Sequence, residues 1–62
     1  MTERMWHCRA SFHAAGAVHH REQSDQQPEA AVRIMAQDVT RETADPNPRL
    51  LRLTAHNLPA KP

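Results

Sequence analysis

Residues 5–14 alternate between polar and apolar side chains, and this run constrains the fold more than any other part of the chain. The even-numbered positions of this run hold apolar or small residues, namely Trp6, Cys8, Ala10, Phe12 and Ala14. Successive side chains of a strand point to opposite faces, so this period of two predicts a β-strand over Met5–Ala14 with one buried face. Gly16, the only glycine, follows at once and predicts a hairpin loop over residues 14–16.

A second strand over Ala17–Gln23 is predicted to return antiparallel to the first. We expect Phe12 to lie opposite Val18, because a shift of one residue would place Phe12 opposite His19. The segment contains few apolar residues. It is therefore expected to be an edge strand.

The segment after the hairpin carries helix signals. Ser24, with Gln27 three residues later, resembles a capping box and predicts a helix that begins at Ser24. Pro28 fits the first turn, where its missing N–H costs little. The helix should end near Thr43, before the Pro-containing segment 45–48. Its predicted apolar stripe consists of Ala31, Val32, Met35, Ala36 and Val39.

A third strand is predicted over Arg49–His56, with Leu51, Leu53 and Ala55 facing the helix and Leu50 facing away. The element order is then β-β-α-β, and a right-handed crossover places the third strand beside the first. We therefore predict an α+β fold, a three-stranded antiparallel sheet of order 2-1-3 with one helix on one face. Residues 1–57 would form a single domain and 58–62 a loose tail, and the other sheet face would stay uncovered.

Composition narrows the classes of function. The chain has 62 residues, one cysteine and a net charge of +1, and alanine accounts for 10 of its apolar residues. Such a small core leaves little room for a preorganised catalytic cavity. No nucleotide-binding or catalytic motif occurs, and the longest small or apolar run, Ala14–Val18, is far too short to span a membrane. We expect a cytoplasmic, non-enzymatic protein without a cofactor.

Charge is unevenly distributed along the chain. Residues 1–21 carry a balance of +2, residues 22–45 of −4 and residues 46–62 of +3. The strands are thus basic and the helix acidic. We expect Arg9, Arg21 and Arg52 to share the uncovered sheet face with several histidines.

Three hypotheses apply to that face: it binds nucleic acid through Arg9, Arg21 and Arg52, it binds a protein, or it is simply solvated. The only aromatic residues, Trp6 and Phe12, are expected to point inward, so the stacking platforms of single-strand binders are missing. We favour a protein-binding regulator or inhibitor, of the kind that phages and mobile elements encode, with a homodimer through the open sheet face as one version.

The residues expected to contact a protein partner are Ile34, Arg33, Arg41 and Leu50. Ile34 lies outside the predicted helix stripe, so it should be an exposed apolar anchor ringed by polar side chains.

Five histidines also raise a metal hypothesis. His13 and His19 would be diagonal neighbours across the hairpin, with His56 joining them if the third strand aligns. The alternative is that all are surface histidines. Cys8 is expected to be an inward-facing residue with an inert thiol.

Overall fold

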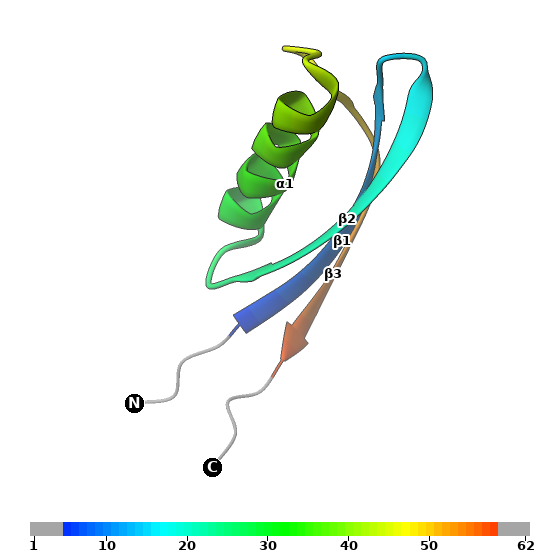
Figure 1. The fold of residues 1–62 in the computed structure, drawn as a ribbon. Helices are drawn as coiled ribbons and strands as arrows, with labels where there is room; N and C mark the ends of the chain where they lie inside the picture. Colours follow the sequence, from blue (N-terminus) through cyan, green and yellow to red (C-terminus); the bar gives the residue numbers. More distant parts are fainter. Residues whose placement is uncertain (1–4, 59–62) are drawn as a thin grey trace.

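The structure, a computed structural model, describes residues 5–58. Its elements are β1 (Met5–Ala14), β2 (Ala17–Asp25), α1 (Pro28–Thr43) and β3 (Arg49–Leu58). The strands form one antiparallel sheet in the order β2-β1-β3, and α1 packs on one face of it (Figure 1). The predicted fold class, element order and strand order are confirmed.

The core lies between β1, the central strand, and one stripe of α1. Its buried residues are Cys8, Ala10, Phe12, Ala14, Ala31, Met35 and Val39. Trp6, Val32 and Ala36 pack against them and are partly buried. The period of two in β1 and the helical stripe are therefore both confirmed. Burial of a side chain such as Phe12 or Met35 stabilises the fold by about 1.5–3 kcal/mol.

The hairpin register differs from the predicted one. Its loop has only two residues, Ala15 and Gly16, with φ of 51° and 78°, which are the positive angles of a type I′ turn. This turn pairs Ala14 with Ala17 and therefore places His19, not Val18, opposite Phe12. The geometry of the turn, rather than the apolar pairing of Phe12 with Val18, decides the register, because the backbone twist of a two-residue type I′ turn matches the twist of the flanking strands.

The observed register also changes the face of the sheet on which Arg21 lies, since Arg21 was expected on the uncovered face. It lies opposite the buried Ala10 and therefore on the face covered by α1. The prediction that Arg9, Arg21 and Arg52 share one face is wrong for Arg21.

The helix begins later than predicted. Ser24 and Asp25 are the last residues of β2, and Gln27 is the N-cap of α1, with Pro28 in the first turn. Gln27 makes no side-chain cap; instead its backbone N–H donates to the Asp25 carboxylate (3.2 Å). The predicted capping box is wrong because the Ser24 hydroxyl bonds the ring of His7 across the sheet (3.1 Å). The predicted end at Thr43 is confirmed.

Strand β3 contains a bulge. Leu53 lies opposite Ala10, but Leu50 lies opposite Phe12, and Leu51 is the additional residue. Two residues of β3, Leu50 and Leu51, thus lie opposite the single residue Phe12 of β1, and both leucines come to the helix side of the sheet. Leu50 was predicted to face away from the helix, and the bulge corrects that prediction. The predicted tail begins within β3, at Leu58, and its residues 59–62 lie outside the described part of the chain.

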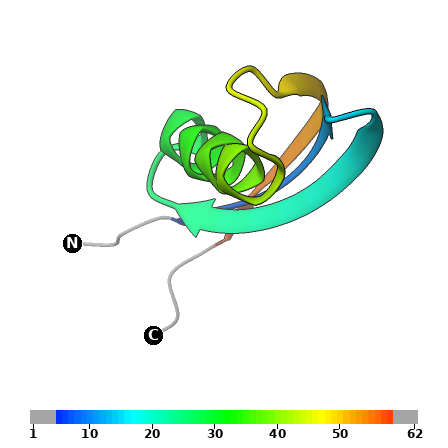
Figure 2. The same cartoon turned by 45° about the horizontal axis from the view of Figure 1, so that its top comes forward.

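The helix is displaced toward one edge of the sheet. It packs on β1 and β2, whereas β3 packs extensively only against β1. Figure 2 shows α1 on one side of the sheet, with the strands curving around it. Among residues 5–58, no helix or further strand covers the second face of the sheet, as predicted. Of the helices in the described residues, none has the length and apolar character that a membrane crossing requires.

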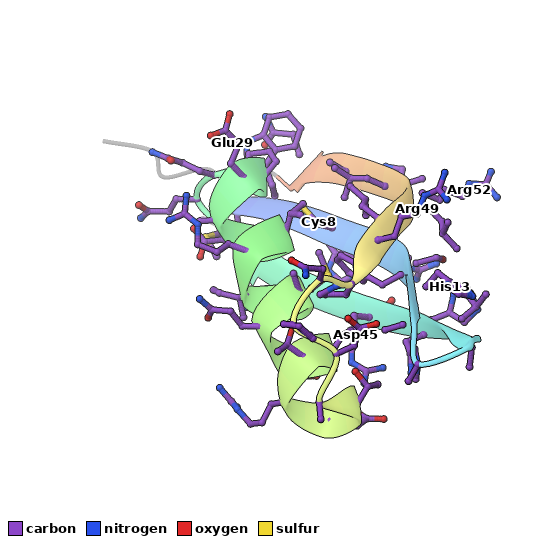
Figure 3. The ribbon with its side chains drawn as sticks, turned by 90° about the horizontal axis from the view of Figure 1, so that it is seen from above. Cys8, His13, Glu29, Asp45, Arg49 and Arg52 are labelled. Carbon is purple, nitrogen blue, oxygen red and sulfur yellow. The ribbon has the colours of Figure 1, made fainter. Side chains whose placement is uncertain are left out.

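Asp45, in the α1–β3 connection, holds the loops together. Its carboxylate accepts hydrogen bonds from the backbone N–H groups of Asn47 (2.9 Å) and of Ala15 in the hairpin turn (3.2 Å); Figure 3 labels the residue. These two hydrogen bonds hold the pKa of Asp45 below its usual value, and the one from Asn47 makes the larger contribution. The hairpin tip is thus tied to the connection that follows the helix.

Candidate functional site

Three exposed leucines lie on the helix side of β3, where α1 does not cover the sheet. Leu50, Leu51 and Leu53 are 43%, 48% and 40% exposed. We call these three residues the leucine shelf. The sequence pattern correctly predicted that Leu51 and Leu53 lie on the helix side of the sheet. It predicted burial there, which is wrong because one helix is too narrow to cover three strands.

A hollow lies between the helix and the α1–β3 connection. This hollow has a volume of about 630 Å³ and is bordered by Ala36 and Thr40 of α1 and by Pro46 and Pro48, which lead into β3. The lining of this hollow is mixed, because it also includes the charged side chains of Arg33 and Arg41.

The shelf lies on an edge strand. β1 occupies the centre of the sheet, so β2 and β3 each have one edge without a strand partner among residues 5–58. β3 is ten residues long, and no proline or lysine interrupts it. Long edges of this kind can pair with a further strand, and natural proteins usually block them with such residues.

The second apolar feature is Ile34, which is 41% exposed as predicted. It borders a hollow of about 290 Å³ on the β2 side of the helix, together with Asp38 and Arg41 of α1 and Arg21 of β2. Arg33 borders the other hollow, beside Pro46. The four expected partner contacts therefore do not form one surface: three lie on α1, and Leu50 belongs to the leucine shelf.

Arg21 links β2 to the acidic helix. Its Nε donates to Asp38 (2.8 Å), one terminal nitrogen donates to Glu42, and the other donates to the backbone carbonyl of His20 (2.9 Å). Its side chain is only 21% exposed. The hydrogen bond to Asp38 is the main reason that the pKa of Arg21 is raised. This ion-pair cluster explains why a helix-side position of the sheet holds an arginine.

The uncovered face, which we call the outer face, carries Arg9, Arg49 and Arg52. Arg9 forms a 2.7 Å ion pair with Glu22, whereas Arg52 has no acidic partner within residues 5–58. A shallow hollow of about 650 Å³ lies between them, and it includes Ser11 and His20, which hydrogen-bond each other (2.9 Å). Most polar groups here are thus satisfied by neighbours, and one cation is neutralised.

The three histidines of the metal hypothesis are not brought together. His19 faces the helix side, opposite Phe12, and its Nε2 bonds the carbonyl of Ala14 (3.1 Å). His13 lies on the outer face and projects away from α1 (Figure 3), while His56 pairs with His7 at the far end of the strand. Within residues 5–58, no three histidine, cysteine or acidic side chains are grouped closely enough to hold a metal ion.

Cys8 lies beneath α1 and is fully buried (Figure 3). Burial is the main cause that raises the pKa of its thiol, with a smaller contribution from the Asp25 carboxylate. A raised pKa lowers the thiolate fraction, so the predicted inert thiol is consistent with this environment.

Comparison with known proteins finds no matching family model, no matching curated protein and no matching solved structure.

Proposed function

We propose that this chain is a small non-enzymatic protein that docks on a protein partner through the leucine shelf. The observation that carries the proposal is the group of three neighbouring leucines, each at least 40% exposed, on the side of the sheet that α1 leaves open. Exposed apolar groups that adjoin one another favour an interaction site, whereas single exposed leucines are ordinary. The free edge of β3 adds backbone donors and acceptors to the same surface.

Docking of this kind fits a regulator or inhibitor that acts by occupying its partner's surface. The role needs no catalytic group and no cofactor. A cytoplasmic location agrees with the single, buried cysteine, which requires no oxidising compartment.

Binding of nucleic acid through the outer face remains a weaker proposal. Arg21 faces α1, and Arg9 is paired with Glu22, so Arg49 and Arg52 are the cations on that face without an acidic partner among residues 5–58. Two such cations predict a shallow dependence of affinity on salt. A gel-shift assay at low salt tests this alternative, and the absence of any shift would eliminate it.

The docking proposal is tested by photo-crosslinking in the native host. A photoreactive amino acid replaces Leu53 in one version of the full chain and Ile34 in a matched control, since the two side chains are almost equally exposed, at 40% and 41%. We expect specific adducts from position 53. Each protein found in an adduct is then purified and titrated with the chain.

Saturable binding that is lost on Leu53→Arg and kept on Ile34→Arg supports the leucine shelf. Absence of adducts from position 53 refutes the proposal. Adducts from position 34 alone would refute it as well and would assign docking to Ile34, Arg33 and Arg41 of the helix.

A further inference from the structure

We propose that the partner on the leucine shelf is a second copy of this chain, joined edge to edge through β3 in an antiparallel six-stranded sheet. Leu53 would face its own counterpart at the two-fold axis. This inference rests on the proposed function, because it names the occupant of the same surface.

Symmetry restricts how two β3 strands can pair. A two-fold axis perpendicular to the sheet keeps both helices on one face and pairs residues of the same face across the new edge. Side chains alternate between the faces, so the axis must pass through a residue rather than between two residues. Only a few registers satisfy this condition over the regular part of β3, residues 52–58.

Charge and apolar matching favour one of the three registers centred on Arg52, Leu53 and Thr54. An axis through Arg52 would set two guanidinium groups directly opposite each other, which is destabilising. An axis through Thr54 would set Arg52 opposite His56 and Leu51 opposite Asn57. An axis through Leu53 instead sets Arg52 opposite Thr54, and Leu51 opposite Ala55. In this register no charge meets a like charge, and the apolar groups on the helix side are contiguous.

The other free edge, that of β2, offers no comparable apolar surface, because none of its helix-side residues has a large apolar side chain. An axis through Arg21 or through Glu22 would set like charges opposite each other. Both residues are already engaged, Arg21 with α1 and Glu22 with Arg9. A second copy therefore fits the β3 edge better than the β2 edge.

The resulting dimer would also explain the displacement of the helix. With β3 at the centre of six strands, the two copies of α1 would lie over the outer strands on the same face. The two leucine shelves would meet between the helices and shield each other from water. The surface that is apolar and open in one copy thus becomes the middle of the assembly.

The oligomeric state of the purified full-length chain tests this inference. We expect sedimentation equilibrium to show an average mass that rises from one chain toward two between roughly 1 and 500 µM, a range typical of a modest interface. Leu53→Arg should raise the dissociation constant about 100-fold or more, because it removes two apolar side chains and sets like charges at the axis. Ile34→Arg should leave it unchanged, and circular dichroism should show that both variants fold.

A cysteine variant tests the register without a change of charge. Directly opposite residues of antiparallel strands have Cα atoms about 4.5–5.5 Å apart, within reach of a disulfide. Mild oxidation should therefore cross-link Leu53→Cys to its own copy but not Thr54→Cys, whose side chain lies on the outer face and opposite Arg52 of the other copy. The native Cys8 is fully buried and will not compete.

A chain that is monomeric at every concentration, or a dimer that Leu53→Arg leaves intact, would overturn the inference. If that monomer nevertheless gives adducts with a different protein from position 53, the docking function stands and only the second copy is refuted. If no adduct forms at position 53, both proposals fail together. Dimers that cross-link through Thr54→Cys instead would refute the register.

Discussion

Replacement of Arg21 by methionine tests the register of the hairpin through its ion pairs with the helix. Methionine keeps most of the aliphatic stem and removes the guanidinium that bonds Asp38 and Glu42. An exposed ion pair contributes about 0.2–1 kcal/mol. Arg21 makes two pairs from a side chain that is only 21% exposed, although the carboxylates are themselves 52% and 59% exposed. We therefore expect Arg21→Met to cost about 1–2 kcal/mol.

That loss is large for a chain of this size, whose core supplies about 3–5 kcal/mol. A loss of 1 kcal/mol lowers the Tm of such a domain by about 4–8 °C. Thermal and urea unfolding should both show the effect, measured at one protein concentration because self-association would shift the Tm. The difference from wild type should shrink in about 1 M salt, where the screening length falls to about 3 Å.

Arg9→Met is the matched control on the outer face. Arg9 forms one ion pair, with Glu22, from a side chain that is 68% exposed. Its removal should cost no more than about 0.5 kcal/mol. If the two variants lose equal stability, or if the Arg21 effect is small and insensitive to salt, Arg21 does not clamp the helix. The register that places it on the outer face would then be correct.

Three further predictions concern the core and the loops. Phe12→Ala removes the largest fully buried side chain and should lower the free energy of unfolding by about 3–5 kcal/mol. Circular dichroism at 25 °C should therefore show a mostly unfolded chain, and a cooperative unfolding transition near the wild-type Tm would contradict this. Ala15→Asn and Ala44→Gly each relieve an alanine with positive φ, and each should stabilise the fold by about 0.5–1 kcal/mol; a lower urea midpoint in either variant would refute the assigned turn or helix cap. Asp45→Asn should destabilise the protein at pH 7, because the folded state depresses the pKa of this carboxyl and the ionised form is the one stabilised. The deficit should shrink as the pH falls through the depressed pKa of the folded state and the carboxyl becomes protonated, and a deficit independent of pH would show that the charge is not involved.

The candidate site was only partly visible in the sequence. Exposure of Ile34 follows from its position off the helical stripe, and the structure confirms it. The leucine shelf was missed, because period two in residues 49–56 shows which leucines share a face but not whether a helix covers that face. A comparison of the width of the helix with the width of the sheet could have found it. A helix is about 10 Å in diameter and strands are about 4.8 Å apart, so one helix covers about two strands and leaves part of a three-stranded sheet open.

The sequence by itself determined the elements and their order. Alternation in residues 5–14, the glycine at position 16 and the prolines at 28, 46 and 48 act on the backbone locally, so each boundary they mark depends on only a few neighbouring residues. The handedness of the crossover then leaves little choice for the strand order.

Tertiary structure decided which side chains meet. The two-residue turn, the contacts of Arg21 with the helix, the bulge at Leu50 and Leu51 and the offset of α1 over β1 and β2 all depend on residues far apart in the chain. Alternative registers differ by only about 1 kcal/mol per cross-strand pair, so the sum of many distant contacts selects among them. For this reason a one-residue difference in the hairpin moved Arg21 from the outer face to the helix, and the open surface of the protein lies on the leucine side of β3.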